Sequence, residues 1–227
     1  MGLGWGIAFR LTRYLFDKHG STQNIHLLFW GNFLMAFLGA KIFFLFVSAG
    51  ENVLLYMESS NFWLGGGFVF YGGFIFAALY TLFLVRLRKV DFKDLALCTI
   101  PLVFGHATGR IGCLLAGCCY GTECVRPWSV WLHQANRHPV QIYESVGLYI
   151  LGFSLLALLN KGYRHFIVPI YLTAYGVLRF SLEFFRADFK RGIWVADLST
   201  SQLVAIVMVG IGLILMVKRL NQRLLPR

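Results

Sequence analysis

The sequence predicts an all-α, polytopic membrane protein with about six to seven transmembrane helices around a central lipid-facing cavity. Hydrophobic residues make up 58% of the 227 residues and charged residues only 14%, and the mean hydropathy is +0.66. Soluble domains carry about 25% charged residues, so a water-soluble globule could not cover its surface with this set. The composition also excludes a disordered chain, a collagen and a small disulfide scaffold.

Apolar stretches close to the length of a bilayer-crossing helix recur along the chain. They cover residues 27–47, 62–85, 95–116, 142–159, 167–185 and 203–217. A further stretch, 2–9, is too short to span and is typical of a truncated or re-entrant helix. No repeat of fixed period and no long hydrophilic linker is visible, so the sequence predicts a single integral membrane domain over residues 1–227.

The net charge of +11 is explained by membrane topology. Thirteen of the 21 Lys and Arg residues lie in segments that the spans place on one side, and four lie in segments 48–61, 117–141 and 187–202 on the other. Loops rich in Lys and Arg face the cytoplasm. The split predicts a cytoplasmic C-terminus and an external 117–141 segment, and it argues against nucleic acid as a partner.

Four cations lie inside the predicted spans or at their ends: Lys41, Arg110, Arg179 and Arg186. A cation at the bilayer centre costs about 2.5–3.5 kcal/mol, so Arg110 and Arg179 each need a partner or an anionic ligand. Arg179, Glu183 and Arg186 are spaced to share one helix face. This ladder either neutralises itself as a structural network or leaves positive charge available to a phosphate.

His106 lies four residues before Arg110, on the same face of a glycine-rich helix. It is either a hydrogen-bonded core residue or a catalytic base. The glycines of the spans indicate either close helix packing or backbone that lines a cavity. The positions concerned are Gly72, Gly73, Gly109 and Gly112.

Four of the five cysteines crowd the end of one span, on the side where disulfides persist: Cys113, Cys118, Cys119 and Cys124. Their spacing fits no paired Cys-x-x-Cys motif, so the sequence predicts no metal site. They either pack, or form a Cys113–Cys118 or Cys119–Cys124 disulfide. A membrane thiol–disulfide redox protein that uses this cluster is one alternative function.

The string HPVQIYE, residues 138–144, enters the next span from the outside. Gln141 and Glu144 then share one helix face. Glu144 either stabilises the first turn of the helix as a capping carboxylate or belongs to a site that needs a carboxylate.

In this order, these segments resemble the prolipoprotein diacylglyceryl transferase family, from about Leu38 to Val217. The specific strings are HPVQIYE and YGVLRFSLEFFR, residues 175–186. Weaker ones are GAK at 39–41, YGG at 71–73, GRIG at 109–112 and STSQ at 199–202.

The resemblance implies a seven-helix enzyme of the bacterial cytoplasmic (inner) membrane. Such an enzyme transfers the diacylglyceryl group of phosphatidylglycerol to the lipobox cysteine of a prolipoprotein signal peptide and releases glycerol 1-phosphate. We expect no cofactor, no metal, and a monomer surrounded by membrane lipids. A catalytically inactive lipid-binding relative is the second alternative.

Matched by position, Arg110, Arg179, Glu144 and Glu183 correspond to the family's functional residues. The candidates for the base that deprotonates the acceptor thiol are His106, Tyr71 and Glu144. Cys113 is a further catalytic candidate, as a thiolate that could itself take the glyceryl group. The expected substrate-binding residues are Lys41, Gly72, Gly73, Gly109, Gly112, His138, Gln141, Tyr143, Tyr175, Arg186 and Gln202.

The chain also departs from the family pattern. The family's motif reads G-R-x-G-N-F-x-N-x-E, and here Cys113 stands at its first Asn and Cys118 at its Glu. Tyr71 stands where a His precedes the paired glycines, and Lys41 stands where Arg is usual. These departures place thiols where the family has amide and carboxylate groups.

Overall fold

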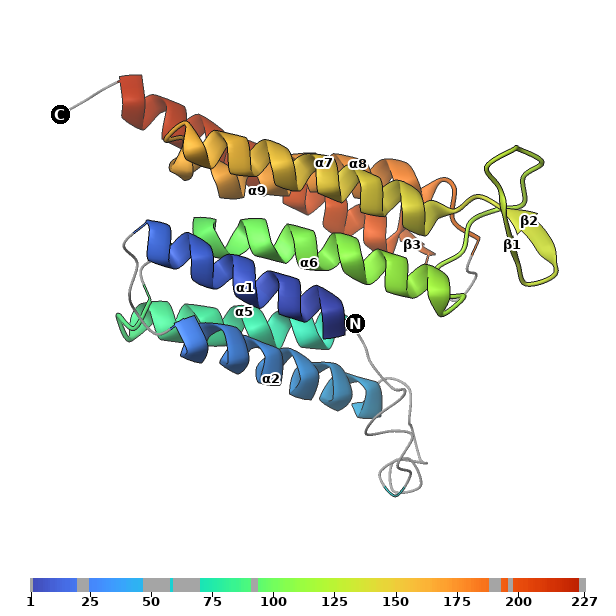
Figure 1. Cartoon of the computed structure of the whole chain (residues 1–227), viewed down its shortest axis with the longest axis horizontal. Coiled ribbons are helices and arrows are strands. Elements are labelled where there is room, and N and C mark those ends of the chain that lie inside the picture. The colour runs from blue at the N-terminus through green and yellow to red at the C-terminus, as the bar shows by residue number, and fades with distance from the viewer. Residues whose placement is uncertain are drawn as a thin grey trace. The chain divides into compact units, whose positions relative to one another are not determined.

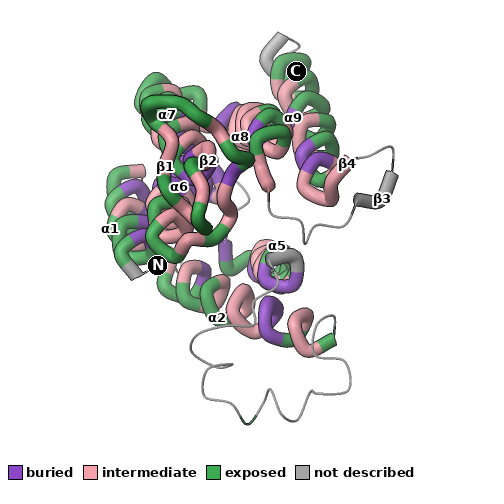
Figure 2. The backbone as a smooth tube through the Cα atoms, turned by 90° about the vertical axis from the view of Figure 1, so that its right-hand side faces the viewer, coloured by how far each residue is buried: buried purple, intermediate pink, exposed green. Residues whose placement is uncertain are grey.

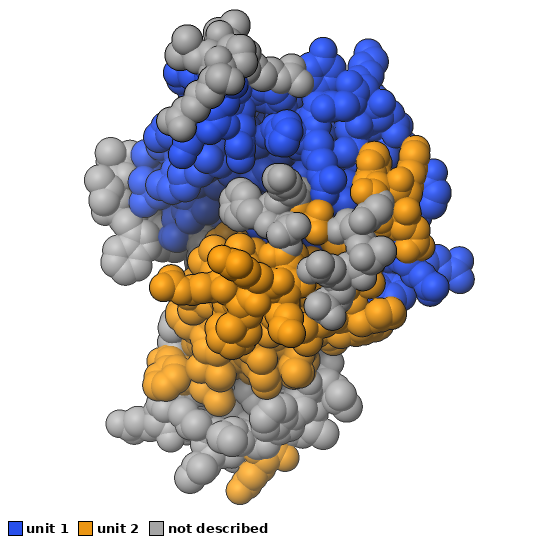
Figure 3. Space-filling view, turned by 90° about the vertical axis from the view of Figure 1, so that its left-hand side faces the viewer, with its two compact units in different colours: residues 1–15, 95–227 blue, residues 16–94 orange. Residues whose placement is uncertain are grey.

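The computed structural model describes residues 2–19, 25–46, 58, 70–90, 94–187, 193–195 and 198–224. The chain divides into two compact units (Figure 3): residues 1–15 with 95–227, and residues 16–94. The single membrane domain over residues 1–227 stays a prediction.

Helices dominate the described residues, as the sequence predicts (Figure 1). They are α1 (Gly2–Lys18), α2 (Ile25–Phe44), α5 (Phe70–Arg86), α6 (Leu95–Leu115), α7 (Val140–Asn160), α8 (Ile167–Glu183) and α9 (Thr200–Leu224), with a short 3-10 turn at Arg164–Phe166 before α8. Antiparallel hairpins pair β1 (Val130–Leu132) with β2 (Ala135–Arg137), and β3 (Ile193–Val195) with β4 (Leu198–Ser199).

Within these ranges, five helices are long and apolar enough to cross a membrane, and α5 contributes a shorter apolar helix. The prediction of an all-α, polytopic membrane protein is confirmed. The predicted span 62–85 is described only from residue 70 onward, and residues 62–69 lie outside the described part.

Helix α1 is longer than the apolar stretch 2–9 suggests, because it continues through Arg10 and Arg13 for a total of 17 residues. Its first half packs on α6 through small residues. A Cβ added at Gly4 would lie 3.0 Å from the Gly105 carbonyl oxygen. Small residues let two helices approach closely. The apolar run therefore underestimates the helix, since the two arginines interrupt the hydrophobicity and not the backbone.

In the first unit, α6, α7, α8 and α9 pack against one another in chain order. Glycines bring α8 and α9 close together: a Cβ at Gly176 would meet Val209, and one at Gly212 would meet Thr173. Fully buried apolar side chains fill the space between these helices, among them Leu97, Ile100, Leu148, Leu155 and Ile167. The outer sides of α7 and α9 are largely exposed (Figure 2), as expected of surfaces that face lipid.

In the second unit, α2 and α5 are in close contact at paired glycines. A Cβ at Gly39 would collide with the Gly72 carbonyl oxygen, and one at Gly72 would collide with that of Gly39. A Cβ at Gly73 would lie 2.8 Å from the Ala36 oxygen. Of the two interpretations of these glycines, close helix packing is confirmed for Gly72 and Gly73.

We expect Gly72→Val to destabilise the α2–α5 pair by about 1–3 kcal/mol, the usual cost of overpacking a tight contact. Thermal unfolding of the detergent-solubilised protein, followed by circular dichroism, measures the effect. Gly210→Val on α9 is the matched control, because a Cβ at Gly210 meets nothing within 4 Å. Equal losses in the two variants would contradict the packing role of Gly72.

The segment between α6 and α7 is ordered around the β1–β2 hairpin. Its residues also pair with the chain that follows α8, where Gly121 bridges Arg186 and the Thr122 amide donates to the Phe185 carbonyl at 2.8 Å. This pairing ties the end of α6 to the end of α8, so side chains from both ends can meet.

Candidate active site

Glu144 is the centre of a charged cluster inside the first unit. It lies on the second turn of α7, and its side chain is only 1% exposed. Arg110 of α6 donates from Nη2 to its Oε1 at 2.9 Å, and the Tyr175 hydroxyl of α8 donates to the same oxygen at 3.0 Å. The capping interpretation of Glu144 is wrong, because the first turn of α7 holds no acidic residue and this carboxylate bonds to neighbouring helices.

Arg179 lies one turn beyond Tyr175 on α8 and connects two carboxylates. Its Nη1 is 3.6 Å from Glu144 Oε2, and its Nη2 is 3.1 Å from Glu183 Oε2. Nη2 also donates to Ser201 Oγ of α9 at 3.0 Å. The predicted Arg179–Glu183 pair at i, i+4 is confirmed. Ser201 was not predicted, and its place in the STSQ string is the only sequence signal that could have indicated it.

The charges of this cluster balance, since two guanidinium groups face the carboxylates of Glu144 and Glu183. Charge-assisted hydrogen bonds of this kind are what buried ions need. This balance stabilises the cluster without a ligand, and the binding of a phosphate by its arginines stays a prediction. Two donors remain, because Arg110 Nε and Arg179 Nη1 are buried without a hydrogen-bond acceptor among the described residues. Buried donors of this sort require an explanation, and a ligand is one.

His106 stands at the edge of the cluster, one turn before Arg110 on α6. Its Nε2 is 3.7 Å from Glu144 Oε1, and its ring meets the Tyr175 ring edge-on at 5.2 Å. The side chain is 27% exposed, so it is reachable from outside the cluster while Glu144 is not. The structure thus places His106 beside the Glu144 carboxylate, which also pairs with Arg110 and Arg179.

Gly109 and Gly112 flank Arg110 on α6. A Cβ added at either position would have nothing within 4 Å in the described structure. Neither glycine is required for close helix packing, in contrast to Gly72. The open space beside them favours the second interpretation, in which bare backbone lines a space next to Arg110.

The HPVQIYE string divides between two environments. Trp128 donates from its ring nitrogen to the Tyr143 hydroxyl at 2.9 Å, and that hydroxyl lies 3.2 Å from His138 Nδ1. These three side chains hold the segment that precedes α7 against the first turn of that helix. Gln141 is 1% exposed and donates to the Cys118 carbonyl at 2.7 Å. Two of the expected substrate-binding residues, His138 and Tyr143, thus have structural partners at the outer edge.

Gln202 has a clear structural role at the start of α9. Its side-chain Oε1 accepts a hydrogen bond from the Ser199 backbone N–H at 2.9 Å, and its own backbone N–H donates to Ser199 Oγ at 3.2 Å. This reciprocal arrangement is a capping box, whose S-x-x-Q signature is readable in the sequence. The structure does not bring the Gln202 amide oxygen to Glu144, because the cap uses it.

Three thiols gather at the end of α6. The sulfur atoms of Cys113, Cys118 and Cys119 all lie within 4.8 Å of one another, and all five cysteines of the chain are free. Hydrogen bonds from the Cys113 thiol and from the Arg186 guanidinium outweigh burial and lower the pKa of Cys119. Cys113 and Arg186, both predicted site residues, therefore contact Cys119. Neither of the two disulfides considered from the sequence is formed.

The second unit contains four of the predicted site residues: Lys41, Tyr71, Gly72 and Gly73. Lys41 is 3% exposed, and its Nζ lies 5.7 Å from the centre of the Phe37 ring. Tyr71 is in the first turn of α5, and its side chain lies outside the described part. Their participation in a site with Glu144 stays a prediction.

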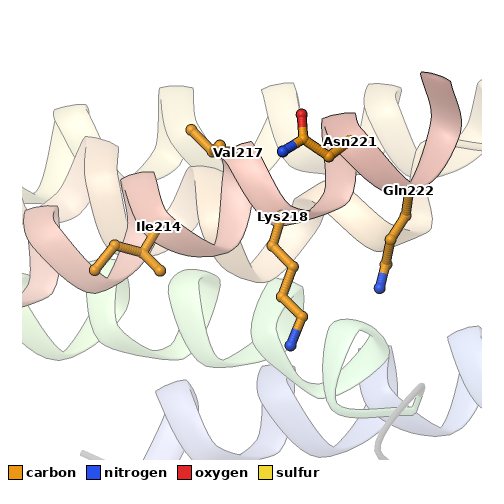
Figure 4. Close-up of a pocket in the computed structure, with 5 residues that line it drawn as sticks. All are labelled: Ile214, Val217, Lys218, Asn221 and Gln222. Atoms are coloured by element: carbon orange, nitrogen blue, oxygen red, sulfur yellow. The ribbon is translucent and has the colours of Figure 1, made fainter. Parts of the chain in front are cut away.

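A shallow depression of about 480 Å³ lies along the last turns of α9 (Figure 4). Its lining residues are Ile214, Val217, Lys218, Asn221 and Gln222. They lie roughly 20 Å or more along the helix axis from Ser201, so this depression is not part of the charged cluster. The central lipid-facing cavity stays a prediction.

The sequence profile of prolipoprotein diacylglyceryl transferases matches residues 1–218. The chain belongs to this family. The match covers nearly the whole chain, including every residue of the Glu144 cluster, and it confirms the resemblance carried by the HPVQIYE and YGVLRFSLEFFR strings.

Individual members of the prolipoprotein diacylglyceryl transferase family are similar over most of this chain. The phosphatidylglycerol–prolipoprotein diacylglyceryl transferase of Clostridium tetani is 34% identical over 78% of this chain and 73% of its own length. The enzyme of that name from Finegoldia magna is 32% identical over 70% of this chain, and that from Desulfotalea psychrophila 30% identical over 97%. The aligned region is 64% of the Finegoldia protein and 87% of the Desulfotalea protein.

Proposed function

We propose that the protein transfers the diacylglyceryl group of phosphatidylglycerol to the lipobox cysteine of a prolipoprotein. The observation that carries this proposal is the Glu144 cluster, in which Arg110 and Arg179 converge on one buried carboxylate. Each arginine has a buried nitrogen that makes no hydrogen bond among the described residues, although Arg179 Nη1 lies 3.6 Å from Glu144 Oε2. Family membership supports the same conclusion, and it does not favour the redox or the inactive lipid-binding alternative.

The reaction forms a bond between the acceptor sulfur and a glyceryl carbon, and it breaks the bond from that carbon to the phosphate oxygen. Negative charge grows on the departing glycerol 1-phosphate. Guanidinium groups suit this charge because they donate two parallel hydrogen bonds and stay protonated in apolar surroundings. We assign Arg110 Nε and Arg179 Nη1 to the phosphate oxygens, with Glu144, Tyr175 and Ser201 holding the two guanidinium groups in place.

The acceptor thiol must lose its proton to become nucleophilic. Of the three predicted bases, Glu144 is buried and already accepts hydrogen bonds from Arg110 and Tyr175. His106 is partly exposed and adjoins the cluster. We therefore assign to it the role of the base that accepts the proton of the acceptor thiol. The role of Cys113 as a covalent nucleophile stays a prediction.

The partners and the location follow from the same proposal. We infer that the enzyme acts as a monomer in the bacterial inner membrane and recognises the signal peptide through its lipobox cysteine. The excess of Lys and Arg on one side of the spans supports a cytoplasmic C-terminus.

The test uses purified protein in detergent with phosphatidylglycerol labelled in its headgroup and a lipobox peptide. We expect release of labelled glycerol phosphate together with a diacylglyceryl mass increase on the peptide. A peptide with Ser in place of the lipobox Cys is the control and should give neither product. Binding of lipid without release of glycerol phosphate would overturn the proposal in favour of an inactive lipid-binding protein.

We expect Arg110→Ala and Arg179→Ala each to reduce kcat/KM strongly and the double variant to lose less than the sum in free energy. Both arginines contact Glu144, and residues that act as a unit are not additive. A double-mutant cycle on the labelled-lipid assay measures the coupling. Strict additivity would mean that the two arginines serve separate sites.

A further inference from the structure

We propose that Cys113, Cys118 and Cys119 form a binding site for a thiophilic divalent cation of the zinc type at the end of α6. The proposal does not rest on the transferase activity, and it gives Cys113 a role other than that of a covalent nucleophile. Its basis is the position of the three sulfur atoms, all within 4.8 Å of one another. Zinc binds thiolates at about 2.3 Å, which places tetrahedral sulfur ligands roughly 3.8 Å apart, so only a small contraction would bring the three sulfurs to ligand distance.

The sequence spacing argues against a zinc site, and the end of α6 explains why that argument fails. Gly117 has φ +65°, its amide donates to the Leu114 carbonyl, and the Cys118 amide donates to the Cys113 carbonyl. This is the Schellman pattern of a helix C-terminus, which folds the chain back over the last turn. Cys118 thereby lies against Cys113, although neither belongs to a Cys-x-x-Cys pair.

The Schellman turn does not account for the third thiol. Adjacent side chains of an extended chain point in opposite directions, yet Cys118 and Cys119 place their sulfurs in one group. Cys119 has φ +62°, a left-handed conformation that is uncommon for residues other than glycine. Strain of this kind persists where the surroundings impose it, often at functional sites.

The surroundings of the thiols fit a thiolate–metal centre. Three thiolates and a divalent cation carry a net charge of −1, and the nearby Arg186 guanidinium supplies a compensating positive charge. The Gln141 amide, buried in α7, donates to the Cys118 carbonyl at 2.7 Å and fixes the turn. Groups that hydrogen-bond around metal ligands, without binding the metal themselves, orient those ligands in protein sites. A fourth position is left to water or to another small ligand.

The metal content of the purified protein tests the proposal directly. The protein is purified under a phosphine reductant, incubated with zinc chloride, desalted and measured by inductively coupled plasma mass spectrometry. We expect one zinc per chain, and a thiolate-to-cobalt charge-transfer band when cobalt(II) replaces zinc. Cys113→Ser, Cys118→Ser and Cys119→Ser should each reduce bound zinc to background.

Cys124→Ser is the matched control, because Cys124 lies in the same external segment but outside the three-thiol group. It should retain zinc in full, and its normal thermal unfolding profile serves as the reference for folding of the other variants. Absence of zinc from the reduced parent protein would overturn the proposal, as would retention of zinc in Cys113→Ser. A Cys113–Cys119 disulfide, trapped by alkylation in intact cells, would overturn it in favour of a redox pair.

Discussion

Glu144→Gln is expected to abolish turnover and to lower the stability of the protein by about 3–5 kcal/mol, the cost of breaking a buried ion pair. The substitution keeps the size of the side chain and removes its charge. Arg179 then keeps only its pair with Glu183, and Arg110 loses the carboxylate that it bonds. An uncompensated guanidinium remains inside the first unit, and the phosphate-binding donors lose the group that orients them.

Thermal unfolding and the labelled-lipid assay measure the two parts of this expectation. Glu123→Gln is the matched control, since Glu123 also pairs with an arginine, Arg137, at 3.2 Å but is 71% exposed. Exposed ion pairs contribute about 0–1 kcal/mol, so the control should keep both stability and activity. Equal shifts in the two variants would mean that the Glu144 pairs contribute no more than a surface pair.

Two central residues of the cluster, Arg110 and Arg179, can be predicted from the sequence by an energetic criterion. Cations at membrane depth are costly, and this cost alone points to Arg110 and Arg179 without knowledge of the carboxylate that pairs with them. The spacing of Gln141 and Glu144 predicted a shared helix face, and both side chains are buried. What the sequence could not give was the pairing between helices, because Arg110 meets Glu144 across 34 residues of chain.

The parts that the sequence missed depend on local backbone geometry. Gln202 looked like a substrate ligand, although the S-x-x-Q pattern with Ser199 already indicated a capping box. Ser201 lies between them and reaches Arg179 because α9 packs on α8, a contact between helices that the sequence does not show. The sequence shows that cysteines crowd the end of α6, but their spacing does not predict that three sulfurs come together, because it does not report the positive φ at Gly117 and Cys119.

Arg179→Lys is expected to reduce kcat/KM by at least about 100-fold, roughly 2.7 kcal/mol, while the protein still inserts and folds. Arg179 directs its two terminal nitrogens to side chains on three helices: Glu144 on α7, Glu183 on its own α8 and Ser201 on α9. A planar guanidinium has enough N–H groups to contact all three side chains and still donate a hydrogen bond to a phosphate. Lysine keeps the charge but offers a single nitrogen on a flexible stem, so it cannot reproduce the fork.

The kinetic parameters distinguish a catalytic effect from a structural one. If Arg179 stabilises charge that develops on the leaving phosphate, kcat and kcat/KM should fall together in Arg179→Lys. Arg219→Lys is the control, because Arg219 is a half-buried arginine near the end of α9 whose side chain bonds Gln222, and it should retain parental kinetics. Near-normal turnover in Arg179→Lys, with a lowered melting temperature, would reduce Arg179 to a structural partner of Glu144 and Glu183. The phosphate would then have to be held by Arg110 without it.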